Sequence, residues 1–302
     1  MQIAYITYQN LGKYTSSVAD EDEILLSFLT KKGLKIKEEI WTDEQVIWGN
    51  YTHLLIKSPW DYFDKYEQWT QWLNHIKLLN LIVINPIITI QWNSDKHYLK
   101  EIESAGLKTT PTQFIEKGTF SDLTTFFTIF ASAALVVKPS VSGGSKNTMR
   151  FNAENVIEIQ ELLNGFLKEE AYMVQPFIEE ITNDGEWSFL FFNGKYSHSL
   201  IKKAKAGDFR VQHYLGGTIH PQTPSKQQIE AIQPYVDQFA KGCLYARVDG
   251  FYRNGEFYLM ELELIEPFLF LFTAPQSYEN YYQALNQMLT SSFSFSSDLA
   301  HN

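Results

Sequence analysis

The chain has 302 residues, of which 44% are hydrophobic and 15% aromatic, so it can build buried cores and is not a wholly disordered protein. Its formal net charge of -10 argues against nucleic acid as a partner, because an acidic surface repels a phosphate backbone. The single cysteine excludes an intramolecular disulfide, and no stretch approaches the ~20 apolar residues of a membrane helix. We expect a cytoplasmic protein of about two or three compact units that binds neither nucleic acid nor membranes.

The first third of the chain alternates between strand and helix patterns. Apolar periodicity predicts helices at 19–32 and 66–79 and strands at 1–8, 34–41, 53–57 and 81–85. Strands that alternate with helices imply a parallel, wound sheet. Residues 1–92 are therefore predicted to form a small α/β domain.

The rest of the chain becomes richer in strands. We predict a helix at 93–105 with Asn93 or Ser94 as its N-cap, and further helices at 120–131, 156–167 and 225–244. Strands are predicted at 109–114, 135–139, 149–151, 171–177, 186–193, 195–202, 246–252 and 256–265. Asn193-Gly194 and Asn254-Gly255 predict hairpins between the last four strands, and residues 291–302 are expected to fray.

Two glutamates on the last predicted strand are the strongest local feature. Because side chains alternate along a strand, Glu261 and Glu263 are predicted to share a face with Phe257 and Leu259, the two carboxylates roughly 6.5–7 Å apart. The hairpin at Asn254-Gly255 can bring Asp249 beside them. Three converging carboxylates suit Mg2+, a hard ion that takes oxygen ligands and bridges phosphates. The alternative is a solvated edge strand on which Arg247 balances the charge.

A loop rich in serine and glycine follows the predicted strand 135–139. Gly143 and Gly144 allow the backbone to approach a ligand closely, and the serines add hydroxyl donors. Lys138, at the end of the strand, would meet a phosphate at the mouth of the loop. The spacing differs from that of a Walker A loop, and a flexible hairpin turn is the alternative.

A positive cluster stands out in this negative chain: Lys202, Lys203, Lys205 and Arg210. The Arg210 guanidinium is suited to bidentate contact with phosphate oxygens, whereas a solvated basic loop is the alternative for the lysines. His198 and His213 are candidate proton carriers, for which packing roles are the more common alternative. We find no convincing Ser-His-Asp or Cys-His nucleophile.

Several motifs in order make a resemblance specific. They are VVKPSVSGGS, VQPFIEEITNDGEWSFLFFNGKYSHSLIKK, GDFRV, ARVDGF and LMELELIEP, preceded by WNSDKHYLKEIESAGLKTTPT. In order and spacing, from about residue 93 to 275, they resemble the ATP-grasp superfamily, and most of all the branch with prokaryotic glutathione synthetase and related peptide and cyclo-ligases. The resemblance implies an α/β (α+β) protein in which a small wound parallel-sheet domain precedes a two-subdomain ATP-grasp fold. It implies a lid subdomain at 93–174 and a C-terminal subdomain with the metal site at 175–302.

The resemblance also implies which residues bind ATP. Lys96 and Lys138 match the two lysines that contact the phosphates and the adenine side. Gln175 and Phe177 match the hinge that reads adenine. Glu186 is expected to bind the ribose hydroxyls, with Glu179 or Glu180 as alternatives because of the ITNDG insertion. The flap that closes over the triphosphate is matched by the loop that contains Ser140, Ser142, Gly143, Gly144 and Ser145.

Metal and catalytic roles follow in the same way. Asp249, Glu261 and Glu263 match the magnesium ligands, although many relatives have Asn in place of Glu263. Arg210 matches the basic residue that steadies the acyl phosphate. The N-terminal domain resembles the small domain that precedes ATP-grasp folds. One segment of this domain follows a buried strand, the place where open α/β sheets bind ligands. We predict that this segment recognises the amine or carboxylate substrate, and a packed aromatic turn is the alternative. Its residues are Lys57, Trp60, Asp61 and Tyr62.

These features together imply an ADP-forming carbon–nitrogen ligase. A substrate carboxylate attacks the γ-phosphorus of ATP, which gives an acyl phosphate and ADP, and an amine then expels phosphate. Arg210 and Lys138 are assigned catalytic roles, since the protein has mainly to position reactants and offset charge. The alternatives are a kinase-like enzyme that forms no amide and a non-catalytic nucleotide-binding regulator. Both substrates, and the choice between ligation and cyclisation, stay open; a homodimer is the default expectation.

Overall fold

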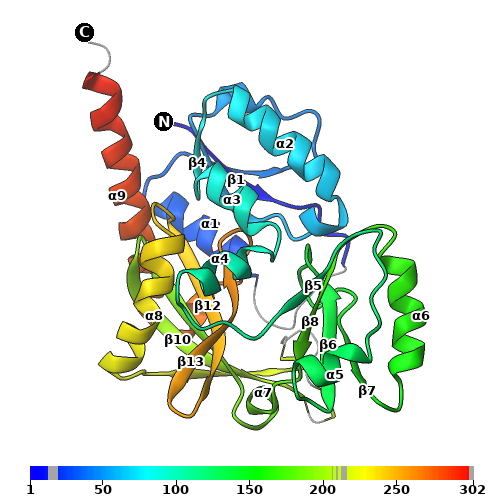
Figure 1. Cartoon of the computed structure of the whole chain (residues 1–302). Coiled ribbons are helices and arrows are strands. Elements are labelled where there is room, and N and C mark those ends of the chain that lie inside the picture. The colour runs from blue at the N-terminus through cyan, green and yellow to red at the C-terminus, as the bar shows by residue number, and fades with distance from the viewer. Residues whose placement is uncertain (13–19, 206, 209, 212–215, 299–302) are drawn as a thin grey trace.

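The computed structural model describes residues 1–12, 20–205, 207–208, 210–211 and 216–298. It contains three sheets, which follow one another along the chain (Figure 1). Among the described helices, none combines the length and the hydropathy that crossing a bilayer requires.

The first sheet is parallel, with the strand order β2-β1-β3-β4. Asp20 is the N-cap of helix α1, and its carboxylate accepts from the N–H groups of Asp22 and Glu23. The wound parallel sheet predicted from the alternating pattern is confirmed. Its elements are β1 (Ile3–Thr7), α1 (Glu21–Lys31), β2 (Ile36–Ile40), β3 (His53–Ser58), α2 (Tyr66–Leu78) and β4 (Ile82–Ile84).

The second sheet is antiparallel, with the order β5-β8-β6-β7. It has an apolar core of its own, to which Leu135, Val137, Leu163 and Tyr172 belong. Strands β6 and β7 form a hairpin, and the Ser/Gly-rich loop connects them. The elements are β5 (Gln113–Ile115), α5 (Thr125–Ile129), β6 (Ala134–Pro139), β7 (Met149–Asn152), α6 (Val156–Phe166) and β8 (Tyr172–Pro176).

The third sheet is antiparallel, with the order β11-β10-β9-β12-β13. Both predicted hairpins form in it, and Asn193 and Asn254 take the positive φ angles, 46° and 54°, that their turns require. The elements are α7 (Glu179–Asn183), β9 (Glu186–Phe192), β10 (Lys195–Lys203), β11 (Thr218–Gln222), α8 (Lys226–Phe239), β12 (Tyr245–Arg253), β13 (Glu256–Glu263) and α9 (Ser277–Asp298).

The first and third sheets share one apolar core, in which Tyr5 and Leu29 pack with Leu190 and Tyr245. The buried Asn85 side chain also links them, because it donates to the carbonyls of Tyr245 and Leu264, both at 2.9 Å, and accepts from Leu244 N at 2.7 Å. The N-terminal domain is thus fixed against the β12–β13 end of the third sheet.

The helix predicted at 93–105 is instead two helices, α3 (Ile87–Asn93) and α4 (Tyr98–Ser104). Asn93 does not cap a helix start: its buried amide donates to Leu262 O at 2.8 Å and accepts from Leu264 N at 3.0 Å, next to the end of β13. Ser94 follows the end of α3, and its hydroxyl donates to Ile90 O. Asn93 is therefore used in bonds to the end of β13, and Ser94 in a bond to Ile90 of α3, so neither side chain caps a helix start.

Other elements differ in extent. Helix α7 contains the first three residues of the ITNDG insertion, and β11 has no counterpart in the predicted elements. Helix α9 continues to Asp298, through most of the segment expected to fray, and residues 299–302 lie outside the described residues. Helix α4, which the expected division assigns to the lid, packs through Tyr98 and Ile102 onto the core of the third sheet.

Candidate active site

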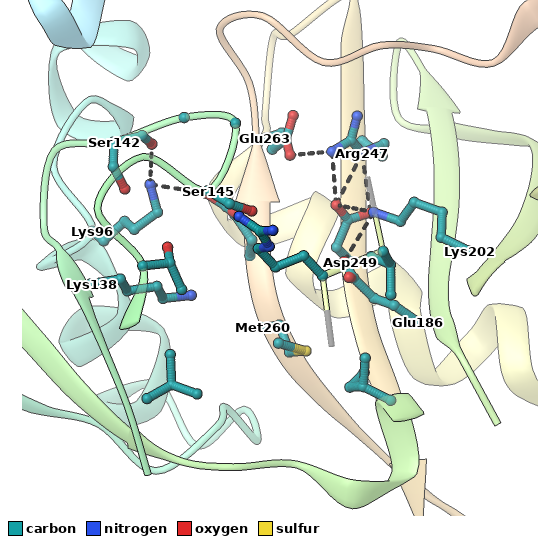
Figure 2. A pocket seen from close by; sticks show the side chains of 18 of the residues that line it. Lys96, Lys138, Ser142, Ser145, Glu186, Lys202, Arg247, Asp249, Met260 and Glu263 are labelled. Carbon is teal, nitrogen blue, oxygen red and sulfur yellow. Dashed lines mark hydrogen bonds and ion pairs between the residues drawn. The ribbon is translucent and has the colours of Figure 1, made fainter. Parts of the chain in front are cut away.

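A cavity of ≈ 270 Å³ lies where the three sheets meet. The second sheet contributes Lys138 and the loop 142–145, and the third sheet contributes the charged side chains of β9, β10, β12 and β13. Trp60 and Phe63 of the N-terminal domain close a third side. Figure 2 shows Lys96 and Lys138 on one side, opposite Glu186, Lys202, Arg247 and Asp249.

The register of the β12–β13 hairpin decides which side chains face the cavity. From the turn to Gly250 the strands pair without interruption, with Gly250 opposite Leu259, but Asp249 lies opposite Glu261 and Arg247 opposite Glu263. Met260 is therefore the extra residue of a β-bulge. An unshifted ladder would place Asp249 opposite Met260 rather than Glu261, so the bulge is what brings the two carboxylates together.

The bulge also corrects the predicted alternation along β13. Phe257 and Leu259 do not share a face with Glu261 and Glu263; they are buried in the core beneath the sheet, and Met260 lines the cavity. Gly250 opposite the bulge has no room for a side chain, since a Cβ there would collide with Tyr258 O and the Phe257 ring.

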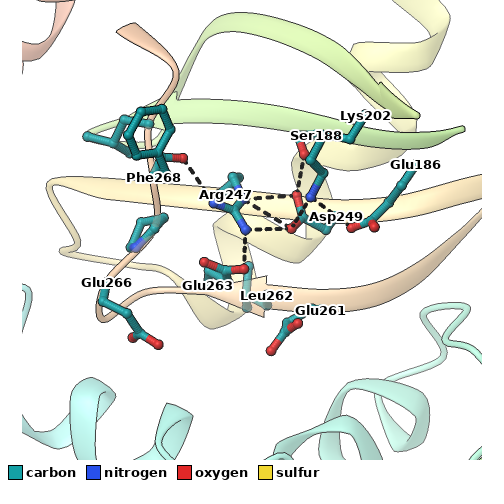
Figure 3. A network of polar contacts seen from close by, with 12 residues as sticks. Glu186, Ser188, Lys202, Arg247, Asp249, Glu261, Leu262, Glu263, Glu266 and Phe268 are labelled. Carbon is teal, nitrogen blue, oxygen red and sulfur yellow. Dashed lines mark hydrogen bonds and ion pairs between the residues drawn. The ribbon is translucent and has the colours of Figure 1, made fainter. Parts of the chain in front are cut away.

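Asp249 and Arg247 form the centre of a buried polar network (Figure 3). The Arg247 guanidinium donates to Asp249 through Nε at 3.0 Å and Nη2 at 2.9 Å, to Phe268 O at 2.9 Å, and to the Glu263 carboxylate. The Ser188 hydroxyl donates to Asp249 at 2.6 Å. Lys202 Nζ bridges Glu186 at 2.9 Å and Asp249 at 3.1 Å.

The pKa values show how charge is distributed across this face. Burial would raise the pKa of Asp249, but Arg247 and Lys202 outweigh it and lower that pKa to about 2. Burial raises the pKa of Glu263 to about 7, with Asp249 and Glu261 adding to the rise and Arg247 opposing it. Burial beside Glu263 also raises the pKa of Glu266 well above its ordinary value. The nearby cations therefore do not offset the effect of burial on Glu263 and Glu266, as they do for Asp249.

Lys96 and Lys138 face the β13 carboxylates from the opposite side. Lys96 Nζ lies 2.9 Å from the Glu261 carboxylate and donates to Ser142 O at 2.5 Å, so it ties the loop to β13. Burial lowers the pKa of Lys138, against the pull of Glu261. Lys96 and Lys138 lower the pKa of Glu261 even though burial would raise it, so Glu261 is ionised at neutral pH.

The Ser/Gly-rich loop faces this cavity and is attached to the N-terminal domain. Gly143 packs so closely on the Phe63 ring that a Cβ would collide with it. Lys146 Nζ lies 3.1 Å from Asp64 and donates to Phe63 O at 3.4 Å. The loop thus covers the cavity from the side opposite to Asp249 and Glu261.

An apolar end of the cavity lies where the second and third sheets join, at Phe177, Ile178 and Met260. Phe177 N–H donates to Ala134 O at 2.9 Å, and the Arg150 guanidinium lies over the Phe177 ring at 3.9 Å from its centroid. The Gln175 side chain, 3% exposed, donates to Thr112 and so is held by the sheet. A flat ring flanked by backbone groups fits this end.

Two family models match the chain. One, described as the N-terminal domain of D-cycloserine synthetase DcsG, matches residues 3–85; the other, described as the ATP-grasp domain of prokaryotic glutathione synthetase, matches residues 107–251. The cycloserine biosynthesis protein DcsG of Streptomyces lavendulae is 25% identical over 272 residues, with 82% of this chain and 87% of that protein covered.

This chain is homologous to the ATP-grasp ligases, whose ATP-grasp domain its residues 107–251 match.

Solved structures give the same fold for the ligase. The crystal structure of D-cycloserine synthetase DcsG superposes with a TM-score of 0.82 at 22% identity, covering 95% of this chain and 100% of that one. D-alanine–D-alanine ligase from Bacillus anthracis, complexed with ATP, superposes with a TM-score of 0.68 at 14% identity over 99% of both chains. Macrocyclase MdnC from Microcystis aeruginosa, bound with precursor peptide MdnA, gives 0.63 at 13% identity, covering 96% of this chain and 100% of that one.

Most of the residues predicted to bind ATP and metal line this one cavity of the ligase: Lys96, Lys138, Ser142, Gly143, Gly144, Ser145, Gln175, Phe177, Glu186, Arg210, Asp249, Glu261 and Glu263. Ser140 does not line it, because its N–H and carbonyl are used in bonds to Ala171 O and Lys96 N. Arg210 lies in the cavity wall with its guanidinium bound to Asp208 at 2.9 Å.

Glu180 is not brought to the cavity. It forms a bidentate pair with Arg253, one bond of which is 2.8 Å long, on the outer side of helix α7. Glu179 lines a separate pocket with Arg150 and Asp208. Of the three glutamates considered for ribose, only Glu186 lies where a nucleotide in the cavity can reach it.

The N-terminal segment predicted to recognise substrate contributes only Trp60. Lys57 is buried between Glu21 and Asp22, at 3.4 and 3.3 Å, and also donates to Pro267 O at 3.2 Å. Asp61 accepts from Trp41 Nε1 and pairs with Lys65, both within 2.7 Å. Tyr62 is buried against Trp69. These three are packing residues, as in the alternative of a packed aromatic turn.

Several residues of the site were missed or placed differently. Arg247 had been considered only as a counter-charge, and Lys202 only as part of a phosphate-binding or solvated basic cluster, yet both are buried at the centre of the network. Glu266 and Phe268 also line the cavity. The two-residue spacing of Arg247 and Asp249 was the available signal for Arg247. His198 Nε2 donates to Leu269 O at 2.9 Å, and His198 does not line the cavity; His213 lies outside the described residues.

The predicted three-carboxylate metal cluster is not formed. Within the described ranges, no group of three His, Cys, Asp or Glu side chains is arranged to hold a metal ion. Asp249 and Glu263 face Arg247, and Glu261 faces Lys96. A magnesium ion that arrives with a nucleotide needs only one or two carboxylates, since phosphate oxygens and water complete its shell. Glu261 and Glu263, which both line the cavity, fit that lesser requirement.

Proposed function

We propose that this ligase joins a small-molecule carboxylate to an amine through an acyl phosphate, with Mg2+ as the metal and with ADP and phosphate as products. The observation that carries the proposal is the placement of ionised Glu261 opposite Lys138 and the Ser/Gly-rich loop across one cavity. Phosphoryl transfer needs this kind of arrangement, because the protein must hold the triphosphate and offset its charge.

The side chains of the cavity divide the work between them. Lys138 and Lys96 supply positive charge to the phosphates, and the backbone N–H groups of the loop around Gly143 surround them. Glu186 is the glutamate placed for the ribose, and the apolar end at Phe177 and Met260 takes the adenine. When bound, Mg2+ would offset charge on the phosphoryl oxygens, with Glu261 and Glu263 as its protein ligands.

Arg247 takes the role for which Arg210 alone was expected. Its guanidinium is buried, is oriented by Asp249, and adjoins Glu263, so it is held rigidly beside the reacting groups. A fixed guanidinium can offset the charge that develops on the acyl carbon's oxygen as the amine attacks. Arg210, partly exposed and paired with Asp208, is placed to enter from the cavity wall. The loop, attached to Phe63 and Asp64, excludes water that would hydrolyse the acyl phosphate.

Small molecules are proposed as both substrates. Support comes from the match of both domains to D-cycloserine synthetase, with a higher TM-score than that of the peptide macrocyclase. We propose a homodimer as the assembly and the cytoplasm, where ATP is supplied, as the location. Neither nucleic acid nor a membrane is proposed as a partner. Light scattering of the purified protein tests the dimer.

Lys138→Ala is expected to weaken the binding of an ATP analogue by roughly 10-fold or more, because it removes a buried charge that forms no ion pair with a carboxylate among the described residues. Binding of the amine should change much less, since the amine lies away from β6. Calorimetric titration with AMPPNP and Mg2+ measures the effect, and an unchanged affinity would count against the phosphate-binding role.

The reaction is tested by ADP release over a panel of amino acids and simple carboxylic acids, each with and without Mg2+, followed by mass determination of the product. A ligase gives ADP together with a product that has lost the mass of one water relative to its substrates. ADP release with a phosphorylated product would instead show a kinase. No magnesium-dependent ADP release with any compound would contradict the proposal.

A further inference from the structure

The charged side chains that line the cavity are paired, with two exceptions. Lys202, Arg247 and Lys96 pair with cavity carboxylates, and Arg210 pairs with Asp208. In the part of the chain that the structure describes, the Lys138 ammonium and the Glu266 carboxylate enter no hydrogen bond and no ion pair, and Figure 3 shows no contact to the Glu266 carboxylate. A charge in a cavity without a partner is costly unless a ligand supplies one.

The two unpaired groups have opposite signs and belong to different parts of the fold. Lys138 ends β6 beside the Ser/Gly-rich loop and suits a phosphate. Glu266 lies three residues after β13, next to the N-terminal domain, where Trp60 Nε1 donates to Glu266 O at 2.8 Å. A phosphate cannot neutralise a carboxylate, because both are negatively charged, so a ligand group that pairs with Glu266 has to be cationic.

The backbone that carries Glu266 is held in place from several sides. Lys57 donates to Pro267 O at 3.2 Å, and Arg247 donates to Phe268 O at 2.9 Å. The buried Glu21 carboxylate accepts from Leu269 N at 2.7 Å and Leu271 N at 2.9 Å. The backbone at Glu266 is therefore fixed by these bonds, so its carboxylate is preorganised in the cavity.

Aromatic rings line the cavity beside Glu266. The Phe268 centroid lies 6.3 Å from that of Trp60 and 4.9 Å from that of Phe270. The Trp60 indole is held beside Glu266 by its bond to Glu266 O, and the Trp60 and Phe268 side chains both line the cavity there. Aromatic faces attract organic cations, whereas Mg2+ prefers a shell of oxygens. A carboxylate beside two aromatic rings is therefore suited to bind an alkylammonium group.

We propose that Glu266, together with Trp60 and Phe268, binds a protonated amino group of the substrate, so that the ligase acts on amino-acid-type compounds rather than on simple carboxylic acids. The inference rests on the proposed function, because it assigns a substrate class to the same cavity. It uses the side of the cavity next to the N-terminal domain, the part of the chain that matches the N-terminal domain of D-cycloserine synthetase.

The test compares pairs of compounds that differ only in the amino group. Each proteinogenic amino acid, in L and D form, is matched with its deaminated carboxylic acid, and both are titrated calorimetrically into the protein with AMPPNP and Mg2+. We expect at least one amino compound to bind at least 10-fold more tightly than its deaminated partner. If no pair shows a preference for the amino compound, the inference is wrong.

Substitutions then assign the preference to Glu266. Glu266→Gln, which keeps the size but removes the charge, should weaken binding of the preferred amino compound by roughly 10- to 100-fold and leave binding of its deaminated partner unchanged. Glu266→Asp should retain part of the preference. The matched control Glu256→Gln, on the exposed turn end of β13, should retain all of it.

AMPPNP affinity separates this inference from two other outcomes. Unchanged affinity in Glu266→Gln shows that the variant is folded and that Glu266 is not a metal ligand. A loss of magnesium-dependent AMPPNP binding with no loss of amino-compound binding would overturn the inference and make Glu266 a metal ligand. A preserved ammonium preference in a protein that releases no ADP would instead contradict the proposed function and leave the amino-group site standing.

Discussion

Glu261→Gln is expected to reduce ATP turnover by at least about 10²-fold while the protein stays folded. Glu261 is the β13 carboxylate that pairs with Lys96, at 2.9 Å, and it lines the cavity together with Lys138. Lys96 and Lys138 lower its pKa against the effect of burial, so the wild-type group carries a full negative charge at neutral pH. The glutamine keeps the shape and an oxygen that can accept from Lys96, but it cannot offset the charge of a metal ion.

ADP release at saturating ATP measures this loss, with circular dichroism to show that the fold is intact. Glu256→Gln is the matched control, because it lies on the same strand at its exposed end, paired with Lys108 at the surface. The control should turn over ATP at the wild-type rate. Undiminished ADP release in Glu261→Gln would remove the metal role from this carboxylate.

Arg247→Met is expected to cost about 3–5 kcal/mol of unfolding free energy as well as most of the activity. The reason is that Arg247 is 7% exposed and is the partner of both Asp249 and Glu263. Methionine fills a similar volume but leaves the carboxylates buried with only Lys202 to compensate them. Removing one member of a buried ion network costs more than the network contributes, because unpaired charge remains.

Urea denaturation of Arg247→Met and of Arg253→Met measures the effect against a matched control. Arg253 lies on the same strand and forms a bidentate pair with Glu180, but its side chain is 38% exposed. Its loss should cost less than about 1 kcal/mol. Arg247→Lys, which keeps the charge but not the bidentate geometry, should be intermediate in stability. Equal stabilities of Arg247→Met and Arg253→Met would show that the polar network contributes little.

The sequence predicted the charged groups of the site better than their geometry. The turn at Asn254-Gly255 correctly predicts the β12–β13 hairpin, but uninterrupted pairing from that turn would place Asp249 opposite Met260 rather than Glu261. Alternation alone cannot reveal the bulge at Met260, which shifts the register by one residue and moves Phe257 and Leu259 to the opposite face. Gly250, a glycine inside a strand, was the local signal for it.

Tertiary contacts explain the residues that were misplaced. Glu180 and Glu186 are six positions apart, and only the start of β9 after helix α7 decides that Glu186 points inward and Glu180 meets Arg253. Lys57 precedes the expected ligand edge of the first sheet, but Glu21 and Asp22, which lie 36 and 35 residues earlier in the chain, capture it in the core. Such partners are invisible to periodicity, because nothing local in the sequence of β3 specifies them.

The most direct test of the whole account is a crystal structure of the protein with AMPPNP and Mg2+. The account predicts the triphosphate between the Ser/Gly-rich loop with Lys138 on one side and the carboxylates of β13 on the other, with the metal bound by Glu261 and the adenine at Phe177 and Met260. A nucleotide bound elsewhere, or a metal ion with no ligand from β13, would contradict it.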